Sequence, residues 1–149
     1  MIQFAIIGYG YMGHVHADSL SKLEDAQLAA VCDREPSMMD DAPEGVLRYQ
    51  DAKELYKNPD IDVVIISANN NQHKELVCMA AGAGKDIICE KPVALCVSDL
   101  DEMLAAVEKN GVRFTVHQQR RYDKDFRTVK DIYEGGSLGN VYTIQTGLY

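Results

Sequence analysis

Short runs of apolar and β-branched residues alternate along this chain with segments in which apolar residues recur at helical spacing. The compact apolar runs predict strands over Ile2 to Ile7, Ala26 to Cys32, Asp62 to Ile66, Asp86 to Cys89 and Val112 to Val116, with a weaker one over Gly45 to Tyr49. Strands that alternate with helices in this way are typical of βαβ units, in which a parallel sheet is covered on both faces. We therefore predict an α/β fold with a doubly wound parallel sheet.

Four segments show the helical pattern. The first runs from Gly13 to Leu23, and the second carries apolar residues from Leu76 to Ala81 before stopping at glycines. A third opens with acidic residues after Ser98 and ends at Asn110, and a fourth covers Asp123 to Tyr133.

The end of the chain differs in kind. From Asn140 to Tyr149 polar and apolar residues alternate, which predicts a strand with one solvated face and no later strand to pair with it. We therefore expect a dinucleotide-binding domain over residues 1–120 and, over 121–149, a linking helix and the first strand of an absent C-terminal substrate domain. An uncovered strand exposes unpaired N–H and C=O groups, so we expect the chain to self-associate through Val141 to Tyr149 or to be poorly soluble. We also expect a homo-oligomer.

Composition narrows the class of protein. The 149 residues are 46% apolar and 26% charged, with a formal charge of -8, and this balance predicts a folded domain. No apolar run is long enough for a bilayer and no basic leader precedes the first strand, so we expect a cytoplasmic protein without a membrane partner. The acidic balance and the lack of a basic stripe argue against binding to nucleic acid.

The four cysteines form no CxxC pair and predict buried apolar packing, without a metal or redox role.

A glycine motif follows the first predicted strand directly. Gly8-Tyr9-Gly10-Tyr11-Met12-Gly13 matches GxGxxG and is followed by a helical pattern. In a dinucleotide site of Rossmann type the first glycine permits the tight turn, the second admits the pyrophosphate and the third lets helix and strand pack closely. Helix N-terminal N–H groups then hold the diphosphate.

An acidic residue ends the second predicted strand. Asp33 lies 20 residues after Gly13, where a carboxylate accepts hydrogen bonds from the adenosine ribose hydroxyls and repels a 2'-phosphate. This favours NAD as the cofactor, although the adjacent Arg34 could stack on the adenine or pair with the 2'-phosphate of NADP. Asp33 could instead serve as a helix cap for the segment that starts at Pro36.

A third motif, Glu90-Lys91-Pro92, directly follows the strand that ends at Cys89. Its position at the carboxyl edge of the sheet is where open α/β folds bind ligands, but the same tripeptide could be a solvated turn. Near an oxidised nicotinamide, a partly desolvated lysine has its charged form disfavoured, so Lys91 could bind a substrate hydroxyl and help move its proton.

With these motifs in order, the chain resembles the N-terminal domain of the glucose-fructose oxidoreductase and inositol dehydrogenase family of NAD(P)-dependent oxidoreductases over essentially its whole length. The matching pieces also include the segments 14–16, 68–73 and 119–123. The resemblance implies hydride transfer between the nicotinamide cofactor and a sugar, polyol or similar small hydroxy compound.

The resemblance also assigns roles to individual residues. It implies a catalytic Lys91 that touches the nicotinamide ribose and the substrate. It implies cofactor contacts along the diphosphate, at both riboses and around the nicotinamide end, made by Gly8, Tyr11, Met12, Asp33, Asn70, His73, Glu90, Gln119 and Arg120. The glycine motif and the end of the second strand add Gly10, Gly13 and Arg34 as candidate cofactor-binding residues.

The sequence departs from the family pattern in two ways. The usual Thr-Pro-Asn is Ala68-Asn69-Asn70, which removes a hydroxyl and a rigid turn. The substrate domain, with the family's Asp and His partners of the lysine, is missing, so we expect a piece of a larger enzyme that binds dinucleotide but does not turn over alone.

The sequence contains four histidines that could be mistaken for catalytic or metal-binding groups. We expect no metal site, because no histidine has an evident ligand cluster. Packing or hydrogen bonding is expected for His14 and His16, and His117 could face the cleft or cap a strand.

Two alternatives to a dehydrogenase domain remain open. One is a stand-alone dinucleotide-binding or sensing module without catalysis. A methyltransferase is the other, because S-adenosylmethionine sites also use a glycine loop and an acid after the second strand.

Overall fold

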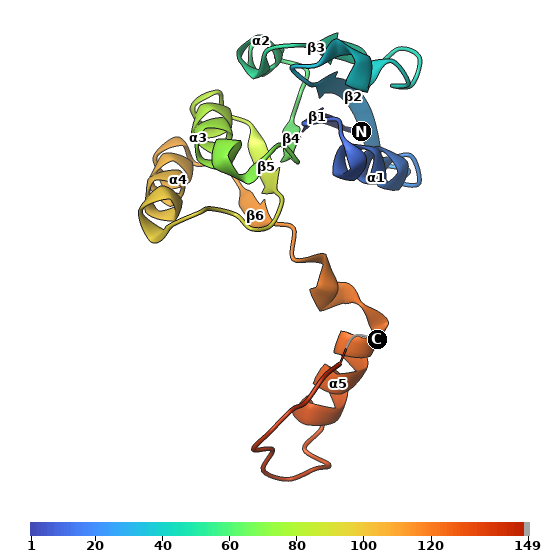
Figure 1. The fold of residues 1–149 in the computed structure, drawn as a ribbon, viewed down its shortest axis with the longest axis vertical. Coiled ribbons are helices and arrows are strands. Elements are labelled where there is room, and N and C mark those ends of the chain that lie inside the picture. The colour runs from blue at the N-terminus through green and yellow to red at the C-terminus, as the bar shows by residue number, and fades with distance from the viewer. Residues whose placement is uncertain (148–149) are drawn as a thin grey trace. The chain divides into compact units, whose positions relative to one another are not determined.

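The computed structural model describes residues 1–147 and contains one six-stranded sheet whose strands are all parallel (Figure 1). The strands lie in the order β3-β2-β1-β4-β5-β6. They are β1 (Ile2–Ile7), β2 (Ala26–Cys32), β3 (Leu47–Tyr49), β4 (Val63–Ile66), β5 (Asp86–Cys89) and β6 (Phe114–Val116). This order is that of a doubly wound Rossmann sheet, so the predicted fold class is confirmed.

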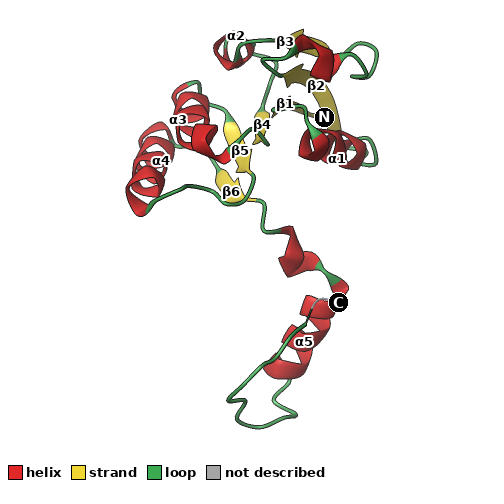
Figure 2. Ribbon diagram, viewed as in Figure 1, coloured by secondary structure: helices red, strands yellow, loops and turns green. Residues whose placement is uncertain are grey.

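Helices connect the strands (Figure 2), as parallel pairing requires. They are α1 (Tyr11–Leu20), α2 (Ala52–Tyr56), α3 (His73–Gly82) and α4 (Val97–Asn110), with short 3-10 turns η1 (Pro36–Met39) and η2 (Asn70–Gln72). The expected helices are present with shifted ends: α1 begins at Tyr11, inside the glycine motif. Helix α2 was not predicted, because its five residues are too few to show a period.

Two apolar clusters pack on the two faces of the sheet. One joins strand residues such as Ile66 to Leu55 of α2, Val77 of α3 and Met103 of α4, all of which are fully buried. The other joins Ile6, Val31 and Ile65 to Leu20 of α1 and to the η1 segment. Neighbouring strand residues therefore point to opposite faces, and helices cover both.

The strands end in register at the carboxyl edge of the sheet. Their last residues pair across it in one row, through Tyr49, Cys32, Ile7, Ile66, Cys89 and Val116. The residue that follows each strand therefore enters a second row, which contains Gln50, Asp33, Gly8, Ser67, Glu90 and His117. The fold thus brings Gly8, Asp33 and Glu90, with which three of the predicted cofactor-binding segments begin, to the same edge of the sheet.

The chain divides into two compact units, Met1–His117 and Gln118–Tyr149. The second contains η3 (Gln119–Tyr122) and α5 (Lys124–Glu134), in which the guanidinium of Arg121 lies 5.7 Å from the centre of the Phe126 ring. The expected strand over 140–149 is not formed over residues 140–147, and residues 148–149 lie outside the described residues. A strand needs a partner for its N–H and C=O groups, and none of the described strands pairs with this segment.

Within residues 1–147, none of the helices has the length and apolar character that a bilayer span requires.

Candidate functional site

A cavity of about 530 Å³ opens at the carboxyl edge, where β1, β2 and β4 end. The chain turns in opposite directions on the two sides of this point, since β1 leads to β2 and β3 while β4 leads to β5 and β6. Ligands of doubly wound folds bind at such a switch point. The cavity is lined by Gly8, Gly10, Asp33 and Arg34 among the predicted residues.

The glycine motif forms the turn from β1 into α1. Gly8 has a φ of +88°, a backbone conformation that other residues rarely adopt, and a Cβ there would lie 2.6 Å from the Ala68 amide nitrogen. A larger residue would therefore strain the backbone and clash with Ala68. Gly13 is buried in α1, where a Cβ would lie 2.5 Å from the Gly8 carbonyl oxygen. Gly10 is the N-cap of α1, and no side chain of the described residues caps this helix, which leaves its first N–H groups available to an anion.

Asp33 holds the glycine turn in place. One carboxylate oxygen accepts the backbone N–H of Tyr9 at 2.9 Å, and the other accepts that of Glu35 at 3.0 Å. The carboxylate is half-buried at the cavity wall, and each oxygen keeps a second lone pair for a ligand hydroxyl. Its contact with Glu35 closes a turn just before η1, but the N-cap of η1 is Glu35 and has no side-chain cap, so Asp33 is not the helix cap considered from the sequence.

Several cavity residues were not predicted. Asn69 and Gln72 line the cavity, whereas Asn70 is exposed and lies outside its lining. Gln50, Asp51 and Lys53 also line it, from the segment that joins β3 to α2. The signal for this second group is the strand end at Tyr49, because every residue after a parallel strand enters the same edge.

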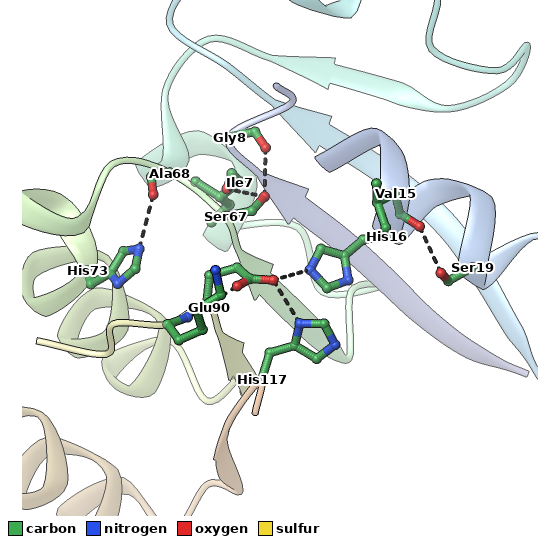
Figure 3. Close-up of polar contacts among 11 residues, drawn as sticks. Ile7, Gly8, Val15, His16, Ser19, Ser67, Ala68, His73, Glu90 and His117 are labelled. Carbon is green, nitrogen blue, oxygen red and sulfur yellow. Dashed lines mark hydrogen bonds and ion pairs between the residues drawn. The ribbon is translucent and has the colours of Figure 1, made fainter. Parts of the chain in front are cut away.

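His73 is fully buried and does not line the cavity. Its ring nitrogen Nε2 lies 3.0 Å from the Ala68 carbonyl oxygen (Figure 3), and Nδ1 lies 3.1 Å from that of Pro92. The ring therefore joins the loop after β4 to the loop after β5. The structure shows this bridging contact; the predicted cofactor contact of His73 stays a prediction.

Glu90 is buried and forms hydrogen bonds with two histidines. Its Oε1 accepts hydrogen bonds from His16 Nε2 at 2.9 Å and from His117 Nδ1 at 2.7 Å (Figure 3), and Oε2 accepts the Lys91 N–H at 3.2 Å. Burial raises the pKa of Glu90, but the hydrogen bonds from His117 and His16 outweigh it and hold the pKa below its usual range. Burial lowers the pKa of His16, partly offset by its bond to Glu90. The carboxylate is thus ionised and fixed, while Lys91 is exposed.

The expectation that no histidine has a ligand cluster nearby is wrong for two of them. His16 lies on the buried face of α1 and His117 directly follows β6, and their ligand atoms and that of Glu90 all lie within 4.8 Å of one another. The expected hydrogen bonding of His14 and His16 is confirmed. His14 contacts the Gly10 carbonyl at 2.7 Å and Asp41 at 3.0 Å, and these two acceptors raise its pKa.

The remaining predicted residues are placed as follows. Tyr11 is exposed and Met12 is half-buried in the first turn of α1. Gln119 and Arg120 belong to the second unit, in η3, where the Arg120 guanidinium pairs with Asp123 at 3.0 Å. Their cofactor contacts remain predictions.

Burial separates the cysteines. Cys32 and Cys89 are buried at the ends of β2 and β5, as expected, and burial raises the pKa of each thiol to about 12. Cys78 is half-buried, and the expected burial is wrong for Cys96, which is exposed just before α4.

Comparison with known proteins shows which proteins this chain is similar to. Residues 2–118 match the model of an oxidoreductase family with an NAD-binding Rossmann fold. The chain is 33% identical over 147 residues to myo-inositol 2-dehydrogenase of Thermotoga maritima and 30% identical over 146 residues to an NADP(+)-dependent scyllo-inositol 2-dehydrogenase of Bacillus subtilis. A solved structure of scyllo-inositol dehydrogenase from Lactobacillus casei with bound NAD(H) and scyllo-inositol has a TM-score of 0.88 at 27% identity.

These relatives are longer than the chain. The matches cover 97% of this chain but 44% and 40% of the two curated dehydrogenases, and 94% of this chain against 43% of the Lactobacillus casei protein. The chain therefore spans less than half the length of the proteins it resembles.

Proposed function

The chain belongs to the glucose-fructose oxidoreductase and inositol dehydrogenase family, whose N-terminal part is an NAD-binding Rossmann domain, and from this premise we propose that it is the cofactor-binding part of a polyol or sugar dehydrogenase. The reaction proposed is hydride transfer from a hydroxyl-bearing carbon of the substrate to the nicotinamide, with release of the hydroxyl proton. The observation that carries the proposal is the cavity at the switch point, which is lined by Gly8 and Gly10 of the glycine turn and by Asp33, hydrogen-bonded to that turn.

The residues present fit a dinucleotide along this edge. The diphosphate would lie over Gly8 and Gly10 at the uncapped start of α1, where N–H groups and the helix dipole favour an anion. Asp33 would accept the adenosine ribose hydroxyls with its free lone pairs. Because a fixed carboxylate repels a 2'-phosphate, NAD is the preferred cofactor, with NADP admitted only if Arg34 offsets the repulsion.

The chemical step would use the other end of the edge. The nicotinamide supplies the hydride acceptor when it is bound. Lys91, exposed at the end of β5, would bind the substrate hydroxyl and hold its departing proton, and the bonds of Glu90 to two histidines would fix the backbone beside it. The substrate pocket and the partners of Lys91 belong to a further domain in this proposal, so the 149-residue chain binds cofactor without turnover.

The test is calorimetric titration of the chain with NAD, NADP and S-adenosylmethionine in parallel. NAD should bind most tightly, and Asp33→Asn should weaken its binding about 10-fold to 100-fold, as expected for the loss of charge-assisted hydrogen bonds. Asp40→Asn is the matched control, since Asp40 is exposed and does not line the cavity. Tightest binding of S-adenosylmethionine, or NAD binding that Asp33→Asn leaves unchanged, would refute the assignment.

The catalytic role of Lys91 needs the full-length parent enzyme. There, Lys91→Met should lower kcat with inositols or related polyols by more than about 100-fold and leave the Kd for NAD within a few fold. A variant that retains kcat would exclude Lys91 from the chemical step.

A further inference from the structure

Three side chains from separate elements converge beneath the carboxyl edge. His16 comes from α1, Glu90 from the end of β5 and His117 from the end of β6, and Figure 3 shows both rings directed at the same carboxylate. His16 and Glu90 are 7% and 5% exposed, and the three ligand atoms lie within 4.8 Å of one another. The cluster lies entirely within the first unit and involves none of the residues that line the cavity.

We propose that this cluster is a binding site for a divalent transition-metal ion, held by His16 Nε2, Glu90 Oε1 and His117 Nδ1. Two imidazoles and one carboxylate are the protein ligands of many catalytic zinc sites and of the facial triad that binds Fe²⁺. Ca²⁺ and Mg²⁺ prefer sites made of oxygen ligands, so the donor set selects zinc and its first-row neighbours.

The spacing of the ligand atoms suits such an ion. Metal bonds of about 2.1 Å put neighbouring ligand atoms about 3.0 Å apart at the right angles of an octahedral site and about 3.4 Å apart at the tetrahedral angles of a zinc site. The two observed separations are 2.9 Å for His16 Nε2 to Glu90 Oε1 and 2.7 Å for His117 Nδ1 to the same oxygen. Each imidazole nitrogen therefore needs to move away from the carboxylate oxygen by about 0.1–0.3 Å for right-angled bonds or about 0.5–0.7 Å for tetrahedral bonds. The two imidazole nitrogens, which lie within 4.8 Å of each other, must both come within reach of the same ion.

Entry of the ion replaces the two N–H···O contacts. To bind the ion, each imidazole carries its N–H on the ring nitrogen opposite the bonded one, so that the lone pair of the bonded nitrogen faces the ion, and the negative charge of Glu90 offsets part of the ion's charge. Glu90 Oε2 keeps its hydrogen bond from the Lys91 N–H, which orients the carboxylate in the way that outer hydrogen bonds orient metal ligands. The remaining coordination positions would be taken by water.

The proposal can be tested on the chain itself, without cofactor. After removal of any affinity tag and of bound metal with a chelator, we expect one Co²⁺ ion per chain to give the visible absorption of a protein-bound ion, and one Zn²⁺ ion to displace it. His16→Ala and His117→Ala should each weaken Co²⁺ binding by at least about tenfold. His14→Ala and Cys96→Ser are the controls, since both residues are outside the cluster and should leave the affinity unchanged.

A measurement on the unaltered chain covers the case in which a variant does not fold. In ¹⁵N spectra of the imidazoles, Zn²⁺ should shift His16 Nε2 and His117 Nδ1, and leave His73 in place. No retained Co²⁺, binding that survives His16→Ala unchanged, or shifts confined to other histidines would each overturn the proposal. Since none of these readouts uses a nucleotide, failure here is separate from failure of the dinucleotide assignment.

Discussion

Replacement of Gly13 by alanine tests the proposed reason for the third glycine of the motif. In an ordinary helix the change from glycine to alanine stabilises by about 0.5–1 kcal/mol, because alanine loses less backbone entropy on folding. At Gly13 the new Cβ would lie 2.5 Å from the Gly8 carbonyl oxygen and 3.3 Å from the Gly8 carbonyl carbon. Both atoms belong to the backbone of a turn that Asp33 and the end of β2 also hold, so they cannot simply rotate away.

The clash should therefore outweigh the helical gain. Overpacking of this kind costs about 1–3 kcal/mol, and with rigid backbone on one side we take the upper half of that range, for a net loss of about 2 kcal/mol. For a unit of this size the loss corresponds to a fall in Tm of roughly 6–10 °C. The assay is urea unfolding followed by far-ultraviolet circular dichroism, with thermal melts alongside.

Gly82→Ala is the matched control. Gly82 is the last residue of α3, and a Cβ there would meet nothing within 4 Å. This variant should be as stable as the parent or up to about 1 kcal/mol more stable. If Gly13→Ala unfolds at the same urea concentration as Gly82→Ala, with an unchanged m value, close packing is not what requires glycine at position 13.

Two further substitutions probe contacts away from the cavity. Tyr56→Phe removes a buried hydroxyl that donates to a carbonyl oxygen of α3 at 2.9 Å, and should lower the free energy of unfolding in urea by about 1–2 kcal/mol. The control is Tyr142→Phe, at a side chain that is 90% exposed, which should leave the free energy of unfolding unchanged. A pKa of His14 above the usual 6.5 should appear in an NMR titration, since its two acceptors favour the protonated ring, and Asp41→Asn should lower that pKa whereas Asp40→Asn should not. Because the folded pKa is raised, the stability that His14 contributes is complete below pH 6.5 and is lost as the pH rises through the folded pKa; a pKa of 6.5 or less would contradict the contact.

The sequence predicted the sheet and the glycine turn because their signals are local. A buried parallel strand needs a continuous apolar run, and the turn from β1 to α1 needs glycine at positions that the motif marks. Helix α2 was missed for the opposite reason: it lasts five residues and depends on the Asp51 side chain, which accepts the Lys53 N–H at 2.9 Å. The segment 140–147 shows the reverse error, since its alternating pattern indicates a strand but a ladder exists only where a partner strand lies beside it.

The contacts of Glu90 show how far sequence reasoning can reach at the site. His16 lies 74 residues away and reaches Glu90 only because α1 packs on the sheet with its buried face, so no spacing rule predicts that pair. His117 was within reach of prediction. It follows β6 as Glu90 follows β5, and adjacent parallel strands that end in register place their next residues side by side.

The in-register strand ends also determine how this domain can be recombined. The last residue of the edge row, His117, is also the final residue of the first unit, so the chain leaves this unit at the carboxyl edge of its sheet. An exchange of everything after this junction would leave every residue of the cavity at β1, β2 and β4 unaltered. The same junction offers protein engineers a natural boundary at which to graft the C-terminal parts of related dehydrogenases onto this domain.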